Sequence, residues 1–88
     1  METQEPAPES GSPLVKAVEF LEKGEWQPAH EIVQGDKSNL AAWLHGIVHT
    51  LEGDLDNARY WYRGGGRDFP GVEGVQREIA SARRRGTR

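Results

Sequence analysis

The chain has 88 residues, a formal net charge of −3 and 35% hydrophobic residues, which suits one small globular domain. It has no cysteine, and this excludes disulfides, thiolate metal sites and a cysteine nucleophile. No apolar run approaches the roughly 20 residues that cross a bilayer, and the start of the chain lacks the apolar stretch of a signal peptide, so we expect a cytoplasmic protein with no membrane partner.

The first residues of the chain combine prolines and glutamates with almost nothing to bury, which predicts a disordered acidic tail. The acidic residues of this tail are Glu2, Glu5 and Glu9. Ser12 followed by Pro13 is typical of a helix start, because a hydroxyl can cap free amides and proline fits the first turn. We therefore expect a tail over residues 1–12, a single all-helical domain over 13–85 and a basic C-terminal end at 86–88.

Two short helices are predicted next from the apolar spacing and the glycines. The first begins at Pro13 and ends at Gly24. Its apolar residues are Leu14, Ala17, Val18, Phe20 and Leu21. The second begins near Trp26 and stops at Gly35, and Pro28 is tolerated in it because first-turn amides have no intrahelical acceptor. Its apolar side consists of Ala29, Ile32 and Val33.

The third helix is predicted to be the central one. Ser38 is a suitable cap for its start, and Gly53 ends it. Its apolar residues cover one wide arc and comprise Leu40, Trp43, Leu44, Ile47, Val48 and Leu51. An arc of this width indicates that the helix is buried on more than one side.

Two further helices complete the predicted domain. Asp54 caps the fourth helix, and the glycines at 64–66 weaken its end. The apolar residues of the fourth helix are Leu55, Ala58, Trp61 and Tyr62. A turn at 69–71 leads into a fifth helix over roughly 71–85. One face of the fifth helix carries Val72, Val75, Ile79 and Ala82.

The same pattern of small residues and turn glycines occurs twice in the chain. Ala17, Phe20, Gly24 and Ala29 correspond in the second copy to Gly46, His49, Gly53 and Ala58. A small residue early in each second helix lets two helices approach closely, and the glycine reverses the chain. This pattern predicts an all-α fold of two antiparallel helical hairpins, with the fifth helix packed against them.

The second copy resembles a tetratricopeptide repeat. The positions that match the signature of that family are Gly46, Gly53, Asp54, Ala58, Tyr62 and Pro70. Two positions depart from it: His49 replaces an aromatic residue, and Gly65 replaces an alanine. The strings AHEIVQ and WLHGIVHTLEGDLDNARYWYR also resemble a group of small uncharacterised proteins, and this second likeness implies no activity.

In tetratricopeptide arrays the first helices line a concave groove that binds peptides. The resemblance places four residues of this chain on that interaction face, namely Leu40, Trp43, Ile47 and Thr50. The face is too apolar to stay in water, so the fifth helix, a second copy of the chain, or a helix or peptide from a partner must cover it. Tyr60 on the fourth helix is a further candidate for recognition.

A candidate pocket or metal site consists of His30, Glu31, His45, His49 and Glu52. His45 and His49 are four positions apart and project from one helical face, with Glu52 farther along the same stripe. The helix that carries His30 and Glu31 packs beside this one in a stack of hairpins. Such a set suits zinc, iron or nickel, or acid–base work at neutral pH. Alternatively, His49 fills an aromatic core position and the other side chains form ordinary hydrogen bonds.

The sequence thus favours a non-enzymatic interaction module that binds a protein helix or peptide, or that forms a homodimer. The alternative is a metal- or small-ligand-binding protein, with or without enzymatic activity, that uses His30, His45 and His49. We assign no catalytic residue, and we expect no cofactor beyond the divalent metal of this alternative. The arginines near the C-terminus lack a broader basic surface, so we do not expect a nucleic-acid partner.

Overall fold

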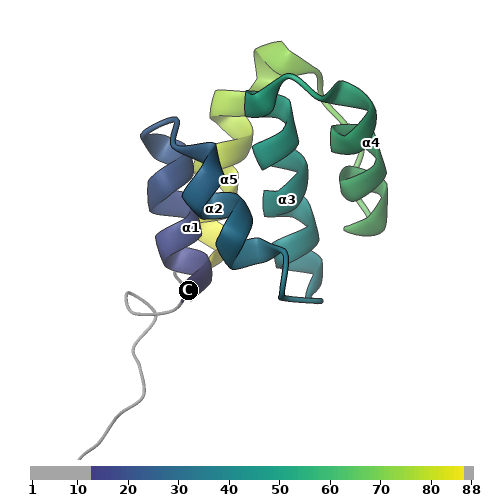
Figure 1. The fold of residues 1–88 in the computed structure, drawn as a ribbon. Helices are drawn as coiled ribbons and strands as arrows, with labels where there is room; N and C mark the ends of the chain where they lie inside the picture. Colours follow the sequence, from purple (N-terminus) through teal and green to yellow (C-terminus); the bar gives the residue numbers. More distant parts are fainter. Residues whose placement is uncertain (1–12, 87–88) are drawn as a thin grey trace, which may run out of the picture.

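A computed structural model describes residues 13–86, and every element in this part of the chain is helical (Figure 1). The elements are α1 (Pro13–Glu22), α2 (Trp26–Val33), α3 (Asn39–Glu52), α4 (Leu55–Gly64), the 3-10 turn η2 (Val72–Gly74) and α5 (Val75–Gly86). The all-α prediction is confirmed. The predicted tail at 1–12 and the last two residues lie outside the described residues. No helix within 13–86 has both the length and the apolar character needed to cross a membrane.

Local signals set the ends of the central helices as the sequence predicted. The Ser38 hydroxyl accepts a hydrogen bond from the backbone N–H of Ala41 at 3.1 Å and so caps α3. Gly53 ends the same helix in the left-handed conformation, with φ at 95°. The Asp54 carboxylate then accepts from the Asn57 N–H at the start of α4.

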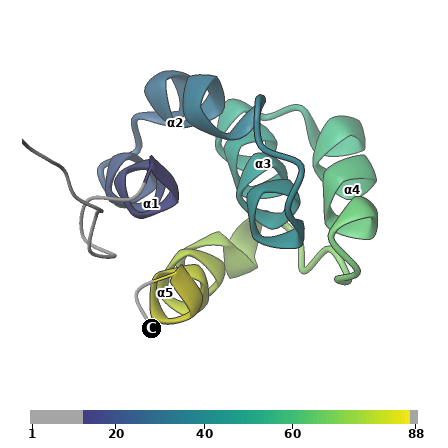
Figure 2. The same cartoon turned by 90° about the horizontal axis from the view of Figure 1, so that it is seen from below.

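The helices form two neighbouring pairs, α1 with α2 and α3 with α4, and α2 also packs against α3. Figure 2 shows α5 beside α1 and α3, on the side of these helices opposite α2. The central α3 therefore has neighbours on several sides, which explains why it is the most buried helix.

Two glycines allow α4 to approach α3 closely. A Cβ atom on Gly46 would lie 2.4 Å from Cδ1 of Tyr62, so only glycine fits between these helices without a shift. A Cβ on Gly65 would lie 3.2 Å from the carbonyl oxygen of Asn39. The glycines after α4 were expected only to weaken its end, whereas Gly65 also permits a contact between the end of α4 and the start of α3.

The fifth helix covers α1 and α3 through apolar side chains and shared polar contacts. Its own residues Ile79 and Ala82 are buried. Val72, expected on the same face, is 50% exposed, because residues 72–74 form a 3-10 turn and α5 begins only at Val75. At the far end, Arg83 donates two hydrogen bonds to the Glu22 carboxylate of α1.

Candidate metal centre

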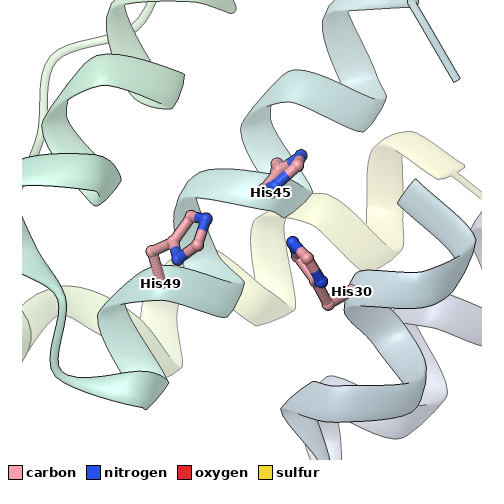
Figure 3. A group of neighbouring side chains, drawn as sticks. All are labelled: His30, His45 and His49. Atoms are coloured by element: carbon pink, nitrogen blue, oxygen red, sulfur yellow. The ribbon is translucent and has the colours of Figure 1, made fainter. Parts of the chain in front are cut away.

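Three histidines from two helices meet beside α3 (Figure 3). His30 comes from α2, and His45 and His49 come from α3. One ligand nitrogen from each ring lies within 4.8 Å of the other two. They are the only histidines in the chain. Sequence reasoning proposed this grouping from the four-residue spacing on α3 and from the neighbouring position of α2.

The packing of α2 on α3 brings His30 to the pair. The adjacent Ala29 is fully buried, and its small side chain lets α2 approach its neighbours. The His30 ring then meets His45 edge-on, with ring centroids 4.8 Å apart, and lies 5.5 Å from the ring of His49. His30 is half-buried, whereas the other two histidines are buried.

Two other rings lie roughly parallel to the ring of His45. The Trp61 indole of α4 lies parallel to it at 3.8 Å with an interplanar angle of 4°. His49 stacks near it at 5.0 Å and 22°. Burial disfavours the imidazolium, and the neighbouring His30 and His49 add repulsion, so the pKa of His45 falls to about 4. His45 is therefore neutral at physiological pH, which is the form that binds a metal ion.

Glu52 contacts one ring nitrogen of His49. The Nδ1 atom of His49 lies 2.7 Å from Oε1 of Glu52, which follows it by three residues on α3. A carboxylate on one ring nitrogen fixes the tautomer and increases the basicity of the other nitrogen. Nε2 of His49 is thereby left as the atom for a ligand role.

The remaining acidic residues near this cluster have other surroundings. Glu31, predicted as part of the site, is exposed and does not belong to the ligand group. Asp54 lies close to His49 and Glu52, but its carboxylate accepts from both the backbone and the side chain of Asn57. We therefore regard Asp54 as the cap of α4.

The all-histidine donor set fits a borderline-soft divalent cation. Zinc–nitrogen bonds of about 2.0–2.1 Å in a tetrahedral site place ligand nitrogens roughly 3.3 Å apart. Separations between the ligand nitrogens of up to 4.8 Å must therefore shorten by up to roughly 1.5 Å around such an ion. The half-buried His30 is the ring with most room to rotate for this adjustment.

The candidate interaction face is largely enclosed. Trp43 and Ile47 are at most 1% exposed, and Leu40 is half-buried. Thr50 is buried and its hydroxyl donates to the Gly46 carbonyl at 2.8 Å. The sequence left three candidates that could cover this face, and the fifth helix is one of them. The structure shows α5 packed on α3. Tyr60 is 60% exposed, and its role in recognition stays a prediction.

The stack of His45 on Trp61 was not anticipated from the sequence. Trp61 was assigned to the apolar side of α4, and no local signal distinguishes a tryptophan that packs on a histidine from one that packs on an aliphatic core.

Comparison with known proteins adds no assignment, because no family model, no curated protein and no solved structure matches this chain. The tetratricopeptide resemblance stays a prediction.

Proposed function

We propose that this protein binds a divalent transition metal ion, with zinc as the leading candidate, through His30, His45 and His49. The observation that supports the proposal is the convergence of three imidazoles from α2 and α3, with ligand nitrogens within 4.8 Å of one another. Imidazole nitrogens suit zinc, copper, iron and nickel, whereas magnesium and calcium prefer oxygen ligands.

Two surrounding contacts and the protonation state of His45 favour metal binding over simple core filling. Trp61 holds the His45 ring in one orientation, and Glu52 orients the His49 ring. His45 is neutral and need not lose a proton before it binds an ion. Three protein ligands leave a fourth tetrahedral position open, and a metal in such a site can polarise a bound water or substrate. A hydrolytic activity is compatible with this arrangement and is not part of the proposal.

The proposal is tested with cobalt(II) and zinc on protein purified without a histidine tag. Wild type is expected to bind one ion, with visible cobalt absorption typical of a four-coordinate site. His30→Ala should abolish binding while the circular dichroism spectrum is preserved, because His30 is half-buried and at the edge of the cluster. Glu31→Ala is the matched control and should bind as wild type does, since Glu31 is exposed and outside the ligand group. Equal zinc affinity in wild type and His30→Ala would reject the proposal.

The interaction role is a second prediction, and it depends on a movement of α5. Recognition of a protein helix, a peptide or a second copy through Leu40, Trp43, Ile47 and Thr50 requires α5 to leave that face. A pull-down with the full chain and with a variant that weakens α5, such as Ile79→Ala, tests this condition. Partner retention that does not increase when α5 is weakened would argue against this face.

A further inference from the structure

A cavity of about 490 Å³ lies next to the histidine cluster, and none of the three histidines lines it. Its walls are the loop between α2 and α3 and the last turns of α4, and its floor is the first turn of α3. The volume falls within the range of small-molecule pockets. Ala42 in the floor precedes His45 by one helical turn, and Trp61 in the wall stacks on His45. The cavity and the cluster thus share one tryptophan.

The charge of the cavity lining favours an anion. Lys37 and Arg63 both line it, and neither makes an ion pair with any residue in the described part of the chain. Asp36 is the one carboxylate of the lining, and its Oδ1 accepts from the Ser38 N–H at 2.8 Å. The lining thus carries two positive side chains and one carboxylate that already accepts a hydrogen bond, so the local electrostatic potential is positive.

The α4 wall of the cavity also carries aromatic side chains. Trp61 is half-buried there, and Tyr60 meets it edge-on with ring centroids 5.3 Å apart. Tyr60 is 60% exposed and is one of two large hydrophobic residues left exposed among residues 13–86. Exposed aromatic rings that border a cavity provide flat, rigid contact area for a ligand. The cavity therefore pairs an aromatic surface with two free cations.

We propose that this cavity binds a small organic carboxylate, with its flat apolar body against Trp61 and Tyr60 and its carboxylate between Lys37 and Arg63. This site is additional to the proposed metal site and uses none of its three ligands. The recognition chemistry requires both parts of the ligand: the anion for the two cations, and the ring for the aromatic wall.

Benzoate is the probe, and the test is a two-dimensional amide NMR titration of the full chain in EDTA. A ligand of this size is expected to bind with a Kd on the order of millimolar. Benzoate should shift amides of the α2–α3 loop, of the end of α4 and the indole N–H of Trp61. Arg63→Gln and Lys37→Gln should each weaken binding several-fold. Lys23→Gln removes the same charge from an exposed position outside the cavity and should change nothing.

Three outcomes would overturn the proposal. The first is the absence of saturable benzoate shifts. The second is equal binding of neutral benzamide, which would remove the role of the cations. The third is equal binding of inorganic phosphate, which would remove the role of the aromatic wall. Because EDTA excludes metal, benzoate binding without zinc binding rejects the metal proposal alone, and zinc binding without benzoate binding rejects this one alone.

Discussion

Glu78 joins three helices through one oxygen atom. Its Oε1 accepts a hydrogen bond from the Trp43 indole of α3 at 2.8 Å and another from the Tyr62 hydroxyl of α4 at 2.9 Å, while its own backbone belongs to α5. Both donors are on buried side chains, and Arg67 lies over the Trp43 ring at 3.5 Å. Sequence patterns placed Trp43 and Tyr62 among the apolar residues of their helices but could not identify this acceptor, because it lies far along the chain.

Replacing Glu78 by alanine is expected to lower the free energy of unfolding by about 2 kcal/mol, since two buried donors lose their acceptor. Glu78→Gln keeps an acceptor oxygen and should lose less. Urea denaturation measures both, and Glu73→Ala is the control because Glu73 is exposed. A loss for Glu78→Ala no larger than for Glu73→Ala would show that the shared acceptor contributes nothing.

Tyr62 provides a pH test of the same contact. Burial first, and then the hydrogen bond to Glu78, raise the pKa of the Tyr62 hydroxyl above its ordinary value. Because the folded-state pKa is the higher one, the associated stability is fully present below about pH 10 and is lost as the pH rises beyond it. In Tyr60→Phe, where Tyr62 is the only tyrosine, phenolate absorbance should appear only together with the loss of helical circular dichroism. A phenolate signal near pH 10 from folded protein would contradict this.

At the scale of elements, local signals in the sequence predict the helices well and their contacts less well. Ser38, Gly53 and Asp54 mark helix ends by local hydrogen bonds and conformation, so sequence reasoning found them. The start of α5 was placed too early, because the 3-10 turn at 72–74 has no such marker. The small residue Ala58 was predicted to let two helices approach closely, and the structure shows that Gly46 is needed as well, because Tyr62 lies against it.

Gly46→Ala is expected to destabilise the protein by about 1–3 kcal/mol, since its Cβ must displace the Tyr62 ring. This loss exceeds the gain of up to about 1 kcal/mol in helix propensity. Gly64→Ala is the matched control: Gly64 is also in a helix, nothing lies within 4 Å of its Cβ position, and the variant should be slightly more stable than wild type. Thermal and urea unfolding of both variants would decide the matter, and a stabilised Gly46→Ala would refute the packing argument.

At the scale of the whole molecule, the two sides of α3 have different surroundings. One side is enclosed by α5, and the other carries the histidine cluster and the adjoining cavity between α2 and α4. The cluster was predictable because it needed only helical spacing and a neighbouring helix. The cavity was not, because it depends on how the α2–α3 loop and the end of α4 are placed in space.

An ion at the cluster would link α2 to α3 and stabilise the whole fold. At a free zinc concentration of 100 times Kd, the free energy of unfolding should rise by about 2.7 kcal/mol. For a domain of this size, that corresponds to a rise in Tm of roughly 10 °C or more. Differential scanning calorimetry with zinc and with EDTA measures the shift, which His30→Ala should lose and Glu31→Ala should keep. Identical shifts in wild type and His30→Ala would place the ion elsewhere.

The parallel stack of Trp61 on His45 has an optical consequence. The indole is a fluorophore, and it lies 3.8 Å from an imidazole that the proposed ion would bind. At this separation the excited state of the indole is sensitive to the charge on its neighbour. The protein thus carries its own emission reporter for the histidine cluster, and in a variant with Trp26 and Trp43 replaced by phenylalanine the occupancy of the site could be followed without a label.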